Sequence, residues 1–138
     1  MKMNLMMLSL GLLIAGYIHA SEVNQLEGQW KGNGKKTAEA RIKSGNLKNE
    51  SIVNRLIPIL SDETYIFTNN TFKISSISRN STSAAIPYEI IKKNNSSVTI
   101  SYQKENSKHN QVTFHFSDDG NCIYIERGKY NDYFCKKI

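Results

Sequence analysis

The 138-residue chain has few of the side chains that catalysis most often uses. It contains three histidines, and if residues 1–20 are removed only His109 and His115 remain. No serine lies in the strained turn of a nucleophile elbow, no glycine-rich phosphate loop is present, and Asp118-Asp119 precedes a glycine as a turn does. The two cysteines are expected to bond each other rather than a metal. The sequence therefore predicts a protein that is not an enzyme and uses no cofactor or metal.

A hydrophobic run long enough to span a membrane is also absent. Residues 5–18 are almost wholly apolar, but a spanning helix needs about 20 residues. Lys2 before this run and the small residue Ala20 after it are typical of a secretory signal peptide, and no cysteine follows that could carry a lipid. We therefore expect cleavage of residues 1–20 and export of residues 21–138 as one periplasmic or secreted domain. A membrane anchor is the alternative interpretation of the first 20 residues.

The excess of positive charge is scattered along the chain. Without Lys2, 17 basic residues (18 − 1) face 12 acidic ones, which gives a net charge of +5. A solvated surface is the simplest interpretation, and attraction to an acidic surface such as anionic lipid or glycan is the alternative. Nucleic-acid binding is not expected, because export separates the protein from nucleic acid and no basic-aromatic stripe is present.

Residues 121–137 contain both cysteines and predict one β-hairpin. Glycine at the first position of a two-residue turn suits a positive φ, which places the turn at Gly128-Lys129. From the turn outward, the expected pairs are Arg127–Tyr130, Glu126–Asn131, Ile125–Asp132, Tyr124–Tyr133, Ile123–Phe134 and Cys122–Cys135. Opposed antiparallel residues have Cα atoms about 4.5–5.5 Å apart, which a disulfide can bridge. The sequence therefore predicts a Cys122–Cys135 disulfide in an oxidising compartment, with two buried free thiols as the alternative.

Three further turns predict the neighbouring hairpins. Asn69-Asn70 and Asp119-Gly120 suit two-residue turns, and a three-residue turn at 93–95 avoids placing a glutamate beside an isoleucine. The expected pairs are Phe67–Phe72 and Tyr65–Ile74, then Ile90–Val98, Tyr88–Ile100 and Ile86–Tyr102, and finally Phe116–Ile123 and Phe114–Ile125. The last hairpin and the cysteine hairpin direct apolar side chains to the same face, an agreement that a shift of one residue would undo.

Two short helices are expected near the N-terminus of the mature domain. The first covers 35–44, where apolar residues recur four apart before a glycine. The second covers 49–57 and should end at Pro58, because proline disfavours a helical residue before it. A strand is the alternative for either segment, since β-branched residues are frequent in 49–60. The expected role of this segment is a lid on the sheet, with membrane docking as the alternative.

The strands predict a mostly β (α+β) fold. We expect eight of them, at 26–32, 65–68, 71–74, 86–91, 98–103, 111–116, 122–127 and 130–135. A polar, mobile loop is expected at 75–85 and a charged loop at 104–110. An antiparallel up-and-down meander of this kind closes into a barrel or a half-barrel, and closure removes exposed strand edges.

The first strand carries the short motif Gly28-Gln29-Trp30. In this respect the chain resembles the lipocalin-like (calycin) barrels, whose first strand typically carries Gly-x-Trp. The helices, the meander and the aromatic-then-basic end at 133–137 extend the resemblance to the end of the chain. The resemblance implies that Trp30 plugs the closed end of the barrel. The family's long loop after strand one is replaced here by helices, which departs from the open-mouthed pocket of that family.

Non-enzymatic binding is the expected function. In the first hypothesis the barrel holds a small apolar ligand, although a barrel of about eight strands can also be filled by its own side chains. The candidate ligand-lining or core residues are Trp30, Phe67, Phe72, Tyr88, Tyr102, Phe114 and Phe116. In the second hypothesis the protein binds a periplasmic protein target through the loops at 75–85 and 104–110, either as an inhibitor of a cell-wall hydrolase or as an immunity protein against a delivered toxin.

Overall fold

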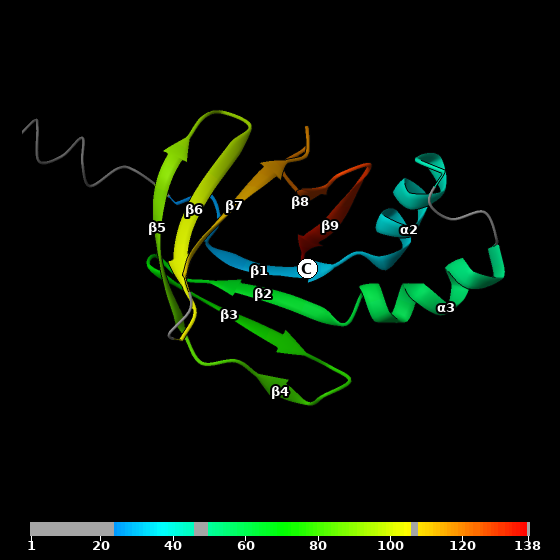
Figure 1. Ribbon diagram of the computed structural model, residues 1–138, viewed down its shortest axis with the longest axis horizontal. Coiled ribbons are helices and arrows are strands. Elements are labelled where there is room, and N and C mark those ends of the chain that lie inside the picture. Colours follow the sequence, from blue (N-terminus) through cyan, green and yellow to red (C-terminus); the bar gives the residue numbers. More distant parts are fainter. Residues whose placement is uncertain (1–23, 46–49, 106–107, 138) are drawn as a thin grey trace, which may run out of the picture.

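The computed structural model describes residues 24–45, 50–105 and 108–137. The predicted signal peptide, residues 1–20, lies outside these described residues. The described part of the chain forms a closed antiparallel barrel of eight strands with two helices beside one end (Figure 1). The predicted mostly β fold, an up-and-down barrel with two short helices, is therefore confirmed.

The elements follow one another with few departures from a simple meander. They are β1 (Gly28–Gly32), α2 (Gly34–Lys43), α3 (Glu50–Leu60), β2 (Glu63–Phe67), β3 (Thr71–Ser76), β4 (Ser81–Thr82), β5 (Ile86–Lys93), β6 (Ser97–Gln103), β7 (His109–Phe116), β8 (Cys122–Arg127) and β9 (Tyr130–Lys136). Strands β1, β2, β3 and β5 to β9 pair in chain order, and β9 pairs with β1 to close the barrel. The two-residue strand β4 only extends the edge of β3.

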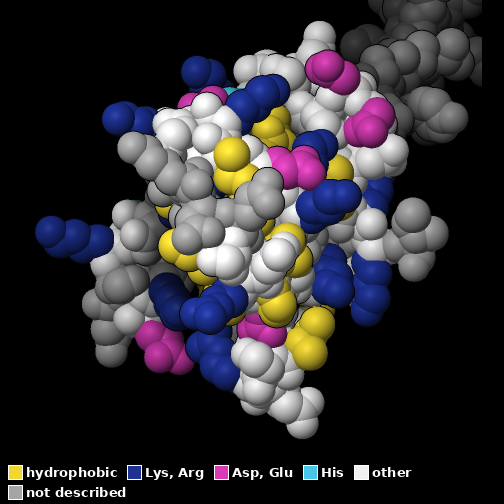
Figure 2. Space-filling model, turned by 90° about the vertical axis from the view of Figure 1, so that its right-hand side faces the viewer, with side chains coloured by type: hydrophobic (Ala, Val, Ile, Leu, Met, Phe, Trp, Pro, Cys, Tyr) yellow, Lys and Arg dark blue, Asp and Glu magenta, His cyan; other side chains and the backbone are white. Residues whose placement is uncertain are grey.

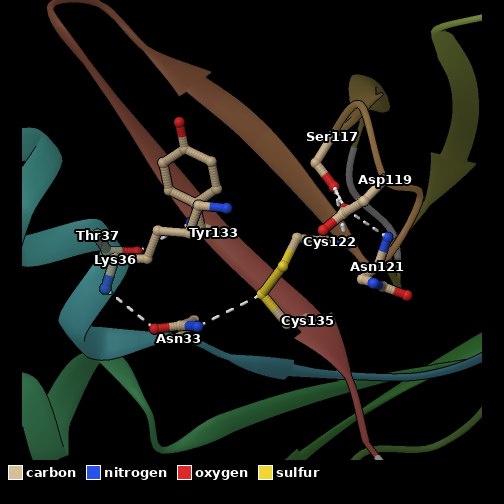
Figure 3. Close-up of a disulfide and its surroundings, with 9 residues drawn as sticks. All are labelled: Asn33, Lys36, Thr37, Ser117, Asp119, Asn121, Cys122, Tyr133 and Cys135. Atoms are coloured by element: carbon tan, nitrogen blue, oxygen red, sulfur yellow. Dashed lines mark hydrogen bonds between the residues drawn. A yellow bond between two sulfur atoms is a disulfide. The ribbon is translucent and has the colours of Figure 1, made fainter.

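The predicted strand registers are confirmed for the hairpins whose turns contain distinctive residues. All six predicted pairs of β8 and β9 are present, and Gly128 has the expected positive φ of 69°. Cys122 and Cys135 form the predicted disulfide (Figure 3). The β2–β3 hairpin pairs Phe67 with Phe72 as expected. Turn chemistry therefore predicts which side chains share a face wherever a two-residue turn joins two strands.

The predicted register of β5 and β6 is wrong by two residues. Tyr88 pairs with Tyr102 and Ile90 with Ile100, and a bulge follows between Ile90 and Lys92. The strands are longer than expected because Asn94 forms the turn with its own side chain, accepting hydrogen bonds from two following backbone N–H groups. A shift of two residues preserves the alternation of faces, so the aromatic side chains still point to the core.

The predicted end of the second helix is also wrong, because α3 continues through Pro58 to Leu60. Proline within a helix removes one backbone hydrogen bond. Pro58 lies in the last turn, and the carbonyl of Ile57 there still accepts a hydrogen bond from Ser61 N (3.0 Å). Packing of the apolar stripe of α3 favours the additional helical turn.

The predicted loop at 75–85 is shorter than expected. Strand β3 reaches Ser76, and β4 follows after a turn at 77–80. Asp62 organises this turn, because its carboxylate accepts hydrogen bonds from Ser76 Oγ, Ser78 N and Ser78 Oγ. The polar residues that suggested a mobile loop therefore form a hydrogen-bonded turn.

The barrel interior is densely packed around Trp30 and Phe67. Trp30 is 1% exposed, and its indole nitrogen donates a hydrogen bond to the carbonyl of Leu26 at 2.7 Å. The Phe67 ring lies 5.4–5.7 Å from the rings of Phe72, Tyr88 and Phe114. This half of the interior is filled by the protein's own side chains.

The helices are attached to the barrel through β9 and the end of β1. Asn33 caps α2 by accepting from Lys36 N, and Thr37 Oγ1 accepts a hydrogen bond from Tyr133 N at 2.9 Å. The end of α3 approaches the chain at Gly34 so closely that a Cβ there would lie 2.2 Å from the carbonyl oxygen of Ile57. Glycine is therefore required where the first strand passes into α2.

Candidate ligand-binding site

Strands β7 and β8 separate soon after the turn that joins them. They pair at Phe116–Ile123 and His115–Tyr124, and the pairing ends there. The expected partners Phe114 and Ile125 are therefore not paired across these strands. The turn residues determine the register next to the turn, but they do not determine how far two strands stay together.

A cavity of about 630 Å³ lies where β7 and β8 part. Its apolar lining comes from β2, β3, β5, β6, β7 and β8, and consists of Tyr65, Phe72, Ile74, Ile86, Ile100, Tyr102, Val112, Phe114 and Ile125. Its polar lining consists of Lys104, Asn110, Gln111, Thr113, His115, Glu126 and Arg127. The cavity thus has an apolar floor in the barrel and a polar rim.

The cavity reaches through the wall of the barrel. Successive side chains of a strand point to opposite faces. Phe114 and Ile125 belong to the inner face, whereas Thr113, His115 and Glu126 belong to the outer face, and all five line the same cavity. Residues from both faces can line one space only if that space extends through the gap between the strands. The gap is therefore a lateral entrance to the interior.

The inner face becomes charged toward the tip of the β8–β9 hairpin. Arg127 Nε lies 3.3 Å from Asp132 Oδ2, and an Arg41 terminal nitrogen from α2 lies 3.5 Å from Asp132 Oδ1. Arg127 and Asp132 share the inward alternation of Ile125 and Phe134. Of these two cations, only Arg127 lines the cavity, where its guanidinium is part of the polar rim.

Tyr65 places a phenol at the boundary between the apolar and charged regions. Its ring packs edge-on against Phe134 at 4.9 Å and against Phe114 at 5.9 Å. Burial, together with the nearby carboxylate of Glu63, raises the pKa of Tyr65 to about 12, and Arg127 opposes the shift. The phenol is therefore neutral at physiological pH and can donate a hydrogen bond inside the cavity.

His115 lies at the outer rim of the entrance. Its Nε2 atom is 3.6 Å from Glu126 Oε1 on the neighbouring strand, and its ring stacks on Tyr124 at 5.0 Å. Tyr124 in turn packs against Tyr133 at 5.3 Å. These outer-face rings hold β7, β8 and β9 together next to the point where β7 leaves β8.

The structure divides the seven predicted lining residues into two groups. Phe72, Tyr102 and Phe114 line the cavity. The other four do not line it: Trp30, Phe67 and Tyr88 are buried in the core, and Phe116 is partly buried against the core. The aromatic candidates thus contribute both to a filled half and to a hollow half of the barrel.

Most of the aliphatic lining and the charged rim of the cavity are not predicted from the sequence. Ile74, Ile100 and Ile125 share the alternation of the aromatic candidates, so their inward direction was predictable although their contact with a cavity was not. Arg127 also has inward alternation, and the predicted register already places Asp132 near it on the same face, but its contact with a cavity was not predictable. Lys104 lies just after the end of a strand, and no sequence pattern there predicts that it lines the cavity.

Two other properties of the site concern metals and membranes. Within residues 24–45, 50–105 and 108–137, no group of three or more His, Cys, Asp or Glu side chains is placed to hold a metal ion. No helix in this same part of the chain has the length and apolar character needed to cross a membrane.

No protein-family model, curated protein or solved structure matches the chain. The geometry of the barrel and its cavity is therefore the basis for a functional conclusion.

Proposed function

We propose that the protein is an exported, non-enzymatic binding protein whose barrel holds one small, mainly apolar molecule between β7 and β8. The observation that carries the proposal is the lateral cavity of about 630 Å³, with its apolar floor and polar rim. Small-molecule sites are typically clefts of about 300–1,000 Å³ with mostly apolar linings and a few placed polar groups. The cavity has this size, and its lining combines an apolar floor with a larger share of polar groups than is typical.

The polar groups at the rim favour a ligand with one polar end. The Arg127 guanidinium can donate two hydrogen bonds to a carboxylate or a carbonyl, and the Tyr65 phenol supplies a neutral donor deeper in the cavity. An apolar body would contact the isoleucines and Phe114 of the floor. The preferred ligand class is therefore a small amphipathic molecule that enters with its apolar end first.

Export is part of the proposal. The Cys122–Cys135 disulfide fits an oxidising compartment such as the periplasm or the extracellular space. The sequence pattern of residues 1–20, which is typical of a signal peptide, also indicates export. The Gly28-Gln29-Trp30 motif and the closed barrel are both compatible with the lipocalin-like resemblance, in which small apolar ligands bind inside such barrels.

Titration with a fluorescent fatty-acid analogue tests the proposal. We expect saturable binding to the protein at one site per chain, and we expect Val112→Trp to abolish it by filling the cavity. Lys73→Trp is the matched control, because it adds the same ring on the exposed outer face of β3 and should leave binding unchanged. Absence of saturable binding, or equal binding by Val112→Trp with an intact circular dichroism spectrum, would overturn the proposal.

Binding of a protein target is a second candidate, favoured by the exposed half of β5. Strand β3 pairs with β5 only at Pro87 and Ile86, so the later residues of β5 have a strand partner on one side only. Ile90 and Ile91 in this half are 39% and 48% exposed. An extended segment of another protein can add to such an edge. Affinity capture from a periplasmic extract by the wild type but not by Ile90→Lys would support this candidate.

A further inference from the structure

The two helices leave an apolar surface uncovered at their end of the molecule. Of the six large hydrophobic side chains that are exposed in the described residues, four are here. Ile42 on α2 is 42% exposed, and Ile52 and Ile59 on α3 are 45% and 67% exposed. Ile77 in the turn after β3 is 65% exposed and is held beside the end of α3 by a hydrogen bond from its N–H to the carbonyl of Asp62.

The exposure of α3 follows from how it is attached. Its last turn contacts the chain at Gly34, whose N–H also donates to Ser61 Oγ at 3.0 Å. Its inward stripe packs toward α2 and the barrel and is half-buried at Val53, Leu56, Ile57 and Leu60. Ile52 and Ile59 are seven residues apart, which places them on one side of the helix two turns apart. The apolar stripe of α3 is therefore wider than the surface that covers it.

Basic residues outnumber acidic ones on the two helices beside this apolar surface, although Asp62 and Glu63 lie near Ile59. Helices α2 and α3 carry five basic residues and two acidic ones, a net charge of +3 (5 − 2). Lys35, Lys43 and Arg55 are exposed. Figure 2, which views this end of the molecule, shows hydrophobic side chains across the middle of the face with Lys and Arg around them. A basic rim around exposed isoleucines is complementary to an anionic, partly apolar surface.

We propose that the helical end of the protein, defined by Ile42, Ile52, Ile59 and Ile77 with the basic residues of α2 and α3, docks on membranes that contain anionic phospholipid. Interfacial helices bind in this way, with apolar side chains at the headgroup boundary and cations near the lipid phosphates. The barrel stays in water, because only side chains of the two helices and one turn enter the interface. This role is independent of the cavity between β7 and β8.

Co-sedimentation with vesicles tests the proposal on protein purified from cells that express the full chain. The mass of each preparation is measured first, so that the N-terminus is the same in all variants compared. Vesicles of phosphatidylglycerol and phosphatidylethanolamine should bind the wild type at low salt, and vesicles of phosphatidylcholine alone should bind it at least about tenfold more weakly. Binding that does not depend on anionic lipid would overturn the proposal.

A pair of matched double variants separates this surface from exposed isoleucines in general. Ile52→Ser with Ile59→Ser should lower the partition coefficient at least about tenfold, because both apolar contacts with the interface are lost. Ile90→Ser with Ile91→Ser removes two isoleucines of similar exposure from β5 and should leave vesicle binding unchanged. Equal effects of the two variants would contradict the proposal. So would a wild type that binds no vesicles but self-associates through the helical end in analytical ultracentrifugation, since that result would assign the surface to a protein contact.

Discussion

Cys122 and Cys135 lie directly opposite each other in the β8–β9 pairing, with their Cα atoms 4.0 Å apart and their sulfur atoms bonded. The next pair, Ile123 and Phe134, points to the opposite face and into the core. Figure 3 shows the disulfide between the β7–β8 turn and the start of α2, where Asn33 Nδ2 lies 3.5 Å from Cys135 Sγ. The disulfide therefore joins strands whose other faces build the barrel interior.

Removing the disulfide should destabilise the protein without changing its fold. We expect Cys122→Ser with Cys135→Ser to lower the free energy of unfolding by about 2–3 kcal/mol, because the crosslink limits the freedom of the unfolded chain across a short loop. Urea denaturation followed by circular dichroism measures this loss. A reductant should produce a similar loss in the wild type and none in the double variant. Equal stability of the oxidised wild type and the variant would contradict the expectation.

A methyl group at Gly34 should detach or displace α3. The added Cβ would lie 2.2 Å from the carbonyl oxygen of Ile57, and backbone atoms cannot move away without shifting the helix. We expect Gly34→Ala to lower the free energy of unfolding by at least about 2 kcal/mol. Gly45→Ala is the matched control, because its Cβ meets open space and only the positive φ of 79° opposes it, at about 1 kcal/mol. A smaller loss at Gly34 than at Gly45 would show that the close contact is not rigid.

The carboxylate of Asp62 should make the β3–β4 turn sensitive to acid. Hydrogen bonds from Ser76 and then from the backbone of Ser78 lower the pKa of Asp62 below its ordinary value of 3.8. A lowered folded-state pKa means that the stabilisation is complete above the unfolded value and is lost as the pH falls through the folded one. We therefore expect Asp62→Asn to be less stable than the wild type at pH 7 and the difference to shrink below pH 3.8.

Urea denaturation at a series of pH values measures this difference. Asp118→Asn is a suitable control, since Asp118 is an exposed residue of the β7–β8 turn and its substitution should not reproduce the pattern. A stability difference at Asp62 that stays constant down to pH 2 would contradict the assigned role of the carboxylate.

Arg127 should discriminate between charged and uncharged ligands. We expect Arg127→Ala to weaken binding of a fluorescent fatty acid about five- to tenfold, because a charge-assisted hydrogen bond at the rim is lost. Binding of the methyl ester of the same probe should change much less. Lys129→Ala is the matched control, since Lys129 lies in the turn of the same hairpin and does not line the cavity. Equal losses for acid and ester would mean that Arg127 acts only through its ion pair with Asp132.

The sequence predicts the barrel well where turns carry their own chemistry. Gly128 and the pair Asp119-Gly120 determine adjacent registers, and both place Ile123 on the core face. The β5–β6 register could not be predicted in the same way, because Asn94 forms the turn with its own side chain and a bulge lies between Ile90 and Lys92. The end of α3 could not be predicted from local sequence either, because packing of the helix outweighs the tendency of Pro58 to end it.

The candidate site is predictable only in part. Alternation along the strands identifies inward-facing residues such as Phe72 and Phe114, and these do line the cavity. The cavity itself arises because β7 and β8 part after two pairs, which is a property of the closed barrel and not of either strand. Asp132 pairs not only with its hairpin neighbour Arg127 but also with Arg41 of α2, which is far from it in the chain. No local pattern reports such contacts.

A methyl NMR titration with an isotope-labelled protein and an unlabelled fatty acid tests the ligand-binding account most directly. We expect saturable chemical-shift changes for the methyl groups of Ile100, Val112 and Ile125, which line the cavity. Ile123 and Val98 are as deeply buried as Ile100 but lie outside the cavity lining, so their methyl groups should shift much less. Changes confined to the helices, or no saturable change at any interior methyl group, would contradict the claim that the gap between β7 and β8 receives a ligand.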